Sequence, residues 1–339
     1  MLNILELHRQ LLEAALPSGF ERPQGELLAR LARPFVDEIR TDALGNVICR
    51  KKGPGKKILF PAHMDVIGLM VTFVDDKGFL RFEPIGGHSP AGLIGATVRL
   101  ESGVRGSIWP DATADVYKHG WQAVDIHDLF IDIGAESREE AEQLAPIGSV
   151  CVFDAQHGET AGGTLMTPYA DDLCGCIALL IAMEELKDQQ VENDLYFAFT
   201  VQEEVGCRGA KGAAFAQAPD VGIALEGTTC NDLGDVPETL QVCNTGRGVC
   251  VSFMDGSSIA NRALFRHTID VAEKNGLSYH VKRSVSGGND AGAIQRARGG
   301  VPTVVLSVPC RYIHSPSSVV KYSDVDSQLA LTQALLKTL

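Results

Sequence analysis

Two adjacent carboxylates, Glu203 and Glu204, have the clearest potential for chemistry in this chain of 339 residues. They follow the run 195–201, whose aromatic and β-branched residues are typical of a buried central strand. At the end of such a strand, two neighbouring carboxylates repel each other and lose solvation, so they need positive charge close by. One or two divalent metal ions are the simplest source of that charge.

Other segments carry further residues of the types that bind metals. Three of them follow apolar runs typical of buried strands, namely 57–62 with His63 and Asp65, 221–225 with Glu226, and 301–308 with His314 a little further on. Asp171 and Asp172 precede a predicted amphipathic helix over about 173–186, where capping explains one carboxylate better than two. Ligands gather at the carboxyl ends of strands in open α/β sheets, so these groups can converge.

A count of charges favours two metal ions. The five candidate ligands are two imidazoles and three carboxylates: His63, Asp171, Glu204, Glu226 and His314. With a bridging hydroxide, the negative charges balance two divalent cations. Mixed imidazole and carboxylate ligation suits zinc or cobalt, followed by manganese. Glu203 is left over as a general base for the metal-bridged water, and a carboxylate such as Asp65 can fix the tautomer of His63.

The elements that must position these residues predict an α/β protein in two domains. Between His63 and Asp171, six short strand patterns indicate a small all-β barrel or sandwich: 68–74, 79–82, 96–100, 103–108, 129–133 and 149–153. We therefore expect an inserted β-barrel domain at 67–162. The catalytic domain would comprise 1–66 and 163–339, with a mostly parallel sheet flanked by helices. Gly162 and Gly163 are a candidate hinge at the return from the insert.

Composition argues against several classes of protein. The net charge of −13 is unsuited to nucleic acids and anionic membranes. We find no apolar run long enough for a membrane helix and no signal peptide at the N-terminus. The nine cysteines show no CxxC spacing, so we expect reduced, buried thiols in a cytoplasmic protein.

Seven stretches resemble the tetrahedral aminopeptidases, a family of dinuclear metallopeptidases that includes glutamyl and deblocking aminopeptidases and some members labelled endoglucanase. They are PSGFE at 17–21, AHMD at 62–65, YADDLCGC at 169–176, VQEEVGCRGA at 201–210, LEGTT at 225–229, GGNDAGAIQ at 287–295 and PCRYIHSP at 309–316. The resemblance implies a zinc-peptidase-like catalytic domain that releases N-terminal residues from short peptides. It also implies a large homo-oligomer, a dodecamer built from dimers, with the inserted domain serving in assembly and walling off the active site.

The resemblance also implies a role for each candidate residue. Asp171 would bridge the two metals, His63 and Glu226 would complete one site, and Glu204 and His314 the other. Glu203 would be the base and Asp65 would orient His63. The chain departs from the family pattern at Leu173, where relatives often carry Arg, and at Glu226, where many carry Asp. The first departure puts a substrate or subunit contact in question.

The loop at Gly287, Gly288 and Asn289 has two interpretations: it lines the active site and binds substrate, or it is a tight turn with an Asn cap. The sequence favours the first, because the loop precedes the His314 strand. Three loop histidines, His88, His119 and His157, are treated as incidental.

Three other functions remain as alternatives. Two-metal deacylases and dipeptidases use similar ligands, but they usually carry the extra domain after the Glu pair. A glycosidase would use Glu203 with a second carboxylate, although its chemistry needs no histidines. A catalytically silent binding protein would lack a ligand or the base. Nothing in the sequence selects the preferred N-terminal residue.

Overall fold

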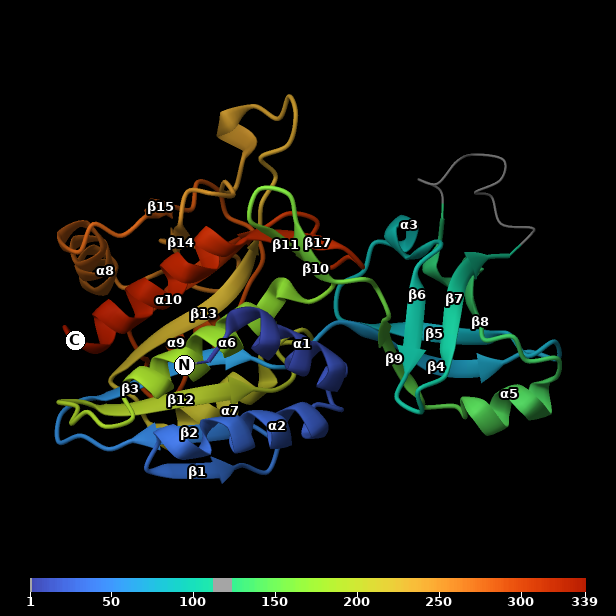
Figure 1. Ribbon diagram of the computed structural model, residues 1–339, viewed down its shortest axis with the longest axis horizontal. Coiled ribbons are helices and arrows are strands. Elements are labelled where there is room, and N and C mark those ends of the chain that lie inside the picture. Colours follow the sequence, from blue (N-terminus) through green and yellow to red (C-terminus); the bar gives the residue numbers. More distant parts are fainter. Residues whose placement is uncertain (1, 112–123) are drawn as a thin grey trace.

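The computed structural model describes residues 2–111 and 124–339. Figure 1 shows two bodies side by side, a larger α/β body that carries both marked chain ends and a smaller β-barrel. The predicted fold class is confirmed, because a mostly parallel sheet flanked by helices is joined to an inserted closed barrel.

An eight-stranded sheet forms the centre of the larger body. Its strands are, in spatial order, β1 (Glu38–Thr41), β2 (Val47–Lys51), β12 (Asp194–Thr200), β3 (Lys57–His63), β13 (Val221–Thr229), β16 (Thr303–Cys310), β14 (Val249–Ser252) and β15 (Tyr279–Val281). The four central strands, from β12 to β16, run parallel to one another. Their carboxyl ends therefore lie along one edge of the sheet, where a site can form.

Helices cover both faces of this sheet. On one face lie α1 (Ile4–Ala14), α2 (Arg22–Ala32), α6 (Ala170–Glu185), α8 (Arg262–Lys274) and α10 (Tyr322–Leu336). On the other lie α7 (Arg208–Gln217) and α9 (Asp290–Gln295). Two short 3-10 helices, η1 (Arg33–Phe35) and η4 (Glu238–Leu240), lie in connecting segments.

Strand β12 shows why its sequence is apolar throughout. Phe197 and Phe199 face the main core under α6, whereas Tyr196 and Ala198 face the smaller core under α7 and α9. A strand covered on both faces has no solvent side, so it lacks the alternation of a half-exposed strand. The polar residues Glu203 and Glu204 therefore follow the strand rather than interrupt it.

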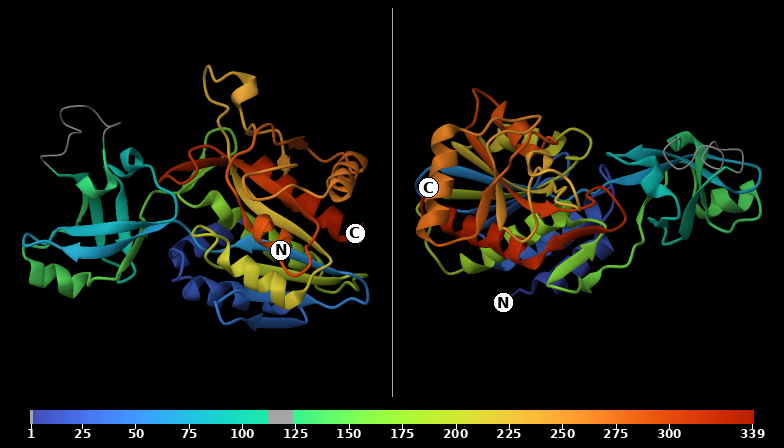
Figure 2. Two further views of the ribbon diagram at one scale, coloured as in Figure 1. Left: turned by 180° about the vertical axis from the view of Figure 1, so that it is seen from behind. Right: turned by 90° about the horizontal axis from the view of Figure 1, so that it is seen from above.

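The barrel is closed and antiparallel. Its strands, in order around the barrel, are β4 (Gly68–Val74), β5 (Leu80–Ile85), β8 (Leu129–Asp132), β7 (Arg105–Pro110), β6 (Thr97–Leu100) and β9 (Val150–Phe153). Beside them lie α3 (Pro90–Leu93), η3 (Ile126–Asp128) and α5 (Arg138–Leu144). Figure 2 shows that the barrel projects to one side of the α/β body. Each of the six predicted strands corresponds to one of these strands, with shifts of a few residues at the ends.

A small third sheet contains β10 (Gly158–Thr160), β11 (Thr164–Thr167) and β17 (Ser318–Lys321). Gly162 and Gly163 have φ values of 76° and 66° and form the turn between β10 and β11. The predicted hinge is therefore wrong: a tight hairpin turn needs left-handed residues, and glycine adopts that conformation without strain. No helix in the described part of the chain is both long and apolar enough to cross a membrane.

Candidate active site

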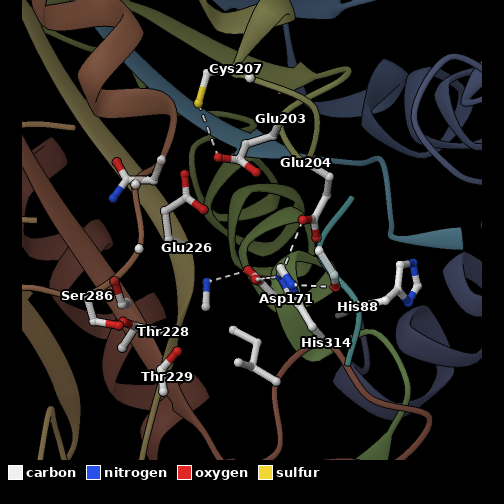
Figure 3. A pocket seen from close by; sticks show the side chains of 18 of the residues that line it. His88, Asp171, Glu203, Glu204, Cys207, Glu226, Thr228, Thr229, Ser286 and His314 are labelled. Atoms are coloured by element: carbon white, nitrogen blue, oxygen red, sulfur yellow. Dashed lines mark hydrogen bonds and ion pairs between the residues drawn. The ribbon is translucent and has the colours of Figure 1, made fainter. Parts of the chain in front are cut away.

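A cavity of about 680 Å³ opens at the carboxyl edge of the central strands. His63 is the last residue of β3, Glu203 and Glu204 follow β12, and Asp171 lies in the first turn of α6. Glu226 lies within β13 rather than at its end, because parallel pairing with β16 extends β13 to Thr229. Figure 3 shows Asp171, Glu204 and His314 close together, with Glu203 and Glu226 beside them.

The five predicted ligands form two groups that share Asp171. In the first, Nε2 of His63 lies 3.4 Å from Oδ1 of Asp171 and 3.7 Å from Oε2 of Glu226. In the second, Nε2 of His314 lies 3.7 Å from Oδ2 of Asp171 and 3.3 Å from Oε2 of Glu204. Each group thus has one imidazole, one carboxylate of its own and one oxygen of Asp171.

These distances fit a metal ion at each group. With metal–ligand bonds near 2.0–2.1 Å, two ligands of one tetrahedral ion lie about 3.3 Å apart. Within the described residues, two sets of donor atoms lie within 4.8 Å of one another, His63 with Asp171 and Glu204, and His63 with Asp172 and Glu226. These sets divide the same cluster differently from the two groups above, because they share His63 and leave out His314. The mixture of imidazole and carboxylate donors suits zinc and similar divalent ions.

The electrostatics of the site also call for cations. Burial raises the pKa of Glu203 to about 8 and that of Glu204 to about 7, and it raises the pKa of Glu226 well above its ordinary value. Burial alone would also raise the pKa of Asp171, but its contacts with His314 and His63 outweigh burial and lower it. A cluster of buried carboxylates that share two imidazoles has too little positive charge, which divalent ions would supply.

Asp65 differs from the sequence-based expectation. The acceptor closest to Nδ1 of His63 is the main-chain oxygen of Asp65 at 3.0 Å, whereas the carboxylate is 3.7 Å away. That carboxylate instead accepts hydrogen bonds from Ser18 Oγ (2.6 Å) and from the backbone N–H groups of Glu203 (2.9 Å) and Glu204 (3.1 Å). Asp65 therefore holds the turn that presents the two glutamates.

Three further polar residues at the site receive no ligand or catalytic role from the sequence, although it singles out Asp172 beside Asp171. Asp172 is fully buried, accepts a hydrogen bond from Gly175 N at 3.1 Å, and leaves Oδ2 without a partner. Asp290 accepts from Thr200 Oγ1 at 2.5 Å, and its Oδ1 also lacks a partner. Cys207 donates from Sγ to Oε1 of Glu203 at 3.2 Å. For Asp172 the signal in the sequence is the pair of carboxylates before a helix. For Asp290 and Cys207 it is only their position inside the matched stretches 287–295 and 201–210.

The loop before α9 combines both interpretations made from the sequence. Gly287, Gly288 and Asn289 all line the cavity. Asn289 also caps α9 by accepting from Ala291 N at 3.0 Å, and its side chain donates to Asp255 at 2.9 Å. The backbone N–H of Asn289 is occupied as well, because it donates to Ser257 Oγ at 3.1 Å. A ligand in the cavity would therefore meet chiefly the two glycines of this loop.

The remaining residues singled out from the sequence lie in different places. His88 lines the cavity and contacts Gly68 O through Nε2 at 2.9 Å, so it is nearer the site than expected. His157 packs against His8, with ring centroids 6.3 Å apart. His119 lies outside the described residues. Leu173 is fully buried in the main core, so at this position the chain presents no side chain to substrate or to another subunit.

Comparison with known proteins identifies the family of this fold and site. The M42 glutamyl aminopeptidase family matches residues 45–331, and the chain belongs to this family. A putative aminopeptidase of Acetivibrio thermocellus is 39% identical over 93% of this chain and 92% of its own length. The lysyl aminopeptidase of Pyrococcus furiosus is 36% identical over 98% of this chain and 97% of its own. The chain is therefore a peptide hydrolase of the aminopeptidase type.

Solved structures agree with this assignment. An aminopeptidase from Desulfurococcus kamchatkensis superposes with a TM-score of 0.94 at 33% identity, covering 99% of this chain and 95% of that one. The TET1 peptidase of Pyrococcus horikoshii, described as assembling into a tetrahedron or a large octahedral shell, has a TM-score of 0.88 at 34% identity, with 99% and 100% covered. A Thermotoga maritima protein described as an endoglucanase has a TM-score of 0.81 at 28% identity, with 97% and 96% covered. M42 peptidases are metal-dependent.

Proposed function

We propose that this chain is a dinuclear metallo-aminopeptidase that releases N-terminal residues from short peptides. The observation that carries the proposal is the sharing of Asp171 between two imidazole–carboxylate groups, with nitrogen–oxygen distances of 3.3 to 3.7 Å. His63 and Glu226 would hold one ion, Glu204 and His314 the other, and Asp171 would bridge them. Zinc or cobalt suits these donors best, followed by manganese.

Two divalent ions bound there would lower the pKa of a water between them and polarise the carbonyl of the scissile bond. Glu203 would accept the proton of the attacking water and deliver it to the departing amine. The carboxylate of Glu203 is free to act as a base because it lies outside both imidazole groups and faces the cavity. The thiol of Cys207 orients it by donating to Oε1 at 3.2 Å. Asp65 would position Glu203 through the backbone N–H that it accepts.

The substrate would be a short peptide with a free α-amine. The carboxylates of Glu203, Glu204 and Glu226 line the cavity, and this acidic lining favours a cationic amine over a blocked N-terminus. Gly287, Gly288 and Asn289 would bind the peptide from the opposite wall through backbone groups. The preferred N-terminal residue is left open, since relatives with lysyl and glutamyl names share this fold.

We further propose two domains, a catalytic domain of residues 1–66 and 163–339 and an inserted barrel of 67–162. The barrel would wall off the active site, because Gly87, His88 and Ser89, between β5 and α3, line the cavity. It would also serve in assembly into a large homo-oligomer, a dodecamer built from dimers, by similarity to the assembling TET1 peptidase. The nine free cysteines suit a reducing, cytoplasmic location.

The test is hydrolysis of aminoacyl-p-nitroanilides by metal-stripped protein, with and without added zinc, cobalt or manganese. N-acetylated analogues and a soluble cellulose derivative are run in parallel, with Glu203→Gln as the matched inactive variant. We expect metal-dependent cleavage of free-amine substrates only, lost in Glu203→Gln. Cleavage of the acetylated substrates would favour a deacylase, and cleavage of the polysaccharide would favour a glycosidase. Either outcome would contradict the proposal.

A further inference from the structure

A second group of metal-binding side chains lies outside the active site. Cys243, Cys250 and His280 each place one donor atom within 4.8 Å of the other two. Among the described residues, four groups of this kind exist, and the other three all include residues of the active-site cavity. Only this group combines two thiols with an imidazole.

The fold places these three side chains together for identifiable reasons. Cys250 on β14 and His280 on β15 are direct partners in a parallel pairing, so both side chains point to the same face of the sheet. Cys243 precedes β14 at the end of the connection from β13, and its Sγ donates to Thr229 O at 3.2 Å. The group thus joins the last two strands of the sheet to a long loop.

The chemical state of the group suits a metal ion. Cys243 and Cys250 are fully buried, which protects a thiolate–metal bond from solvent. Nδ1 of His280 is buried without a hydrogen-bond partner, and Nε2 accepts a contact from Asn244 N at 3.3 Å. The main chain of Arg247 also lies against the ring.

A third thiol lies beside the group. Cys230 packs against Cys243 and Cys250, but its Sγ donates to Asp232 Oδ1 at 3.0 Å and to Cys243 O at 3.2 Å. Asp232 is in turn held by Arg311, at 2.6 and 3.0 Å. Cys230 therefore lies beside the three-residue group, with its thiol engaged by Asp232 and by the main chain of Cys243.

We propose that Cys243, Cys250 and His280 bind a zinc ion with a structural role, at a site separate from the catalytic centre. Two thiolates and one imidazole supply three of the four donors that zinc takes in structural sites. Binding releases the two thiol protons to solvent, and the two thiolates neutralise the charge of the ion. This proposal does not depend on the dinuclear mechanism.

The ion would fasten the loop between β13 and β14 to the edge of the sheet. This loop, residues 230–248 with η4, projects from the top of the molecule in Figure 1. Thr229 and Lys282 flank the group in sequence and line the active-site cavity. A bound ion would thus hold the loop return and the adjacent cavity wall in one arrangement.

The test is cobalt substitution, followed by near-ultraviolet absorption, in stripped full-length protein kept under reducing conditions. The proposed catalytic ligands are nitrogen and oxygen only, so sulfur-to-cobalt charge-transfer absorption reports on thiolate ligation elsewhere. We expect this absorption in the native protein and its loss in Cys243→Ala and Cys250→Ala. It should persist in Cys49→Ala, a buried thiol on β2, and in Cys207→Ala, a thiol that lines the cavity.

A second measurement uses the native protein, in case the cysteine variants fail to fold. A mercurial reagent that blocks thiols should release one zinc ion per subunit and leave the zinc bound by imidazoles and carboxylates. Absence of charge-transfer absorption in protein with nine titratable thiols would overturn the proposal. The proposal would also be overturned if the charge-transfer absorption were lost in Cys207→Ala alone, or if the mercurial released no zinc. Each readout is independent of peptide hydrolysis, so failure here leaves the aminopeptidase proposal standing.

Discussion

The two halves of the proposed metal centre are built in different ways. His63 and Glu226 lie on central strands of the sheet, and their side chains are only 1% and 4% exposed. His314 lies on a loop after β16 with φ of 59°, and its side chain is 34% exposed. Its Nδ1 contacts Gly87 O at 3.1 Å, on the segment that follows barrel strand β5. We call these the inner and outer halves.

This difference indicates how the site depends on the rest of the fold. The inner half is fixed by strand pairing, because β3 and β13 are hydrogen-bonded neighbours in the sheet. The outer half depends on a loop whose histidine is supported from the barrel side. A ligand that is held less rigidly binds its metal less tightly. We therefore expect the outer ion to be the more exchangeable one.

The largest effect should come from Asp171→Ala, which removes the only ligand common to both halves. We expect loss of both ions and a fall in kcat/KM on the order of 10³-fold or more, since bound metal supplies several kcal/mol of transition-state stabilisation. Metal analysis and p-nitroanilide kinetics measure these effects. Asp188→Asn, an exposed residue beyond the other end of α6, is the control. Full metal content in Asp171→Ala would show that the halves do not share a bridge.

His63→Ala and His314→Ala should separate the halves. Both should lower kcat/KM by at least about 10²-fold, because each removes a metal ligand. Only His63→Ala should also lower the thermal midpoint of the metal-free protein, since it leaves a buried void beside unpaired carboxylates. Calorimetry of stripped protein and metal analysis provide the comparison. Equal thermal midpoints for the two variants would mean that the inner half contributes no more to the stability of the metal-free protein than the outer half.

Gly87→Ala tests the support that the barrel side gives to His314. A Cβ at Gly87 would lie 3.1 Å from Nδ1 of His314 and force it to shift, whereas a Cβ at Gly92 would meet nothing closer than 3.6 Å. We expect metal affinity of the outer half to fall about 10- to 100-fold in Gly87→Ala, with the inner half unchanged. Gly92→Ala is the matched control. Weakening of both ions to the same degree would contradict independent halves.

The smallest effect on activity should come from His8, which lies in neither half. Burial lowers its pKa to about 4, against 6.5 for the ordinary group. The unfolded state therefore takes up the proton first as pH falls, and stability present above pH 6.5 is lost progressively down to about pH 4. The loss amounts to about 3 kcal/mol.

Chemical unfolding of stripped protein at a series of pH values measures this loss of stability. His8→Gln should flatten the acid limb of the profile, while His267→Gln on α8 should leave it unchanged. An identical acid limb in His8→Gln would assign the loss to other groups. Because the protein is stripped, loss of metal at low pH does not contribute to the profile.

Much of the fold could be anticipated from local patterns. Continuous apolar runs predicted β3, β12, β13 and β16, because strands buried on both faces must be apolar throughout. Short alternating strands predicted the barrel. Loops were predicted less well, because a turn and a flexible linker can have the same composition. Gly162 and Gly163 indicated a hinge but form a hairpin turn.

The sequence alone determined which residue types follow or end the buried strands. Those types favour a proposed metal site with imidazole and carboxylate ligands, with Glu203 left as the proposed base. Only the tertiary structure decided how these residues are used. It brings Asp172 beside His63 and Glu226, and Asp290 beside Glu203 and Cys207. It also assigns the Asp65 carboxylate to the backbone of Glu203 and Glu204 rather than to His63. It also pairs Cys250 with His280 across two strands. These relations depend on register and strand order between segments far apart in the chain, which local sequence patterns do not encode.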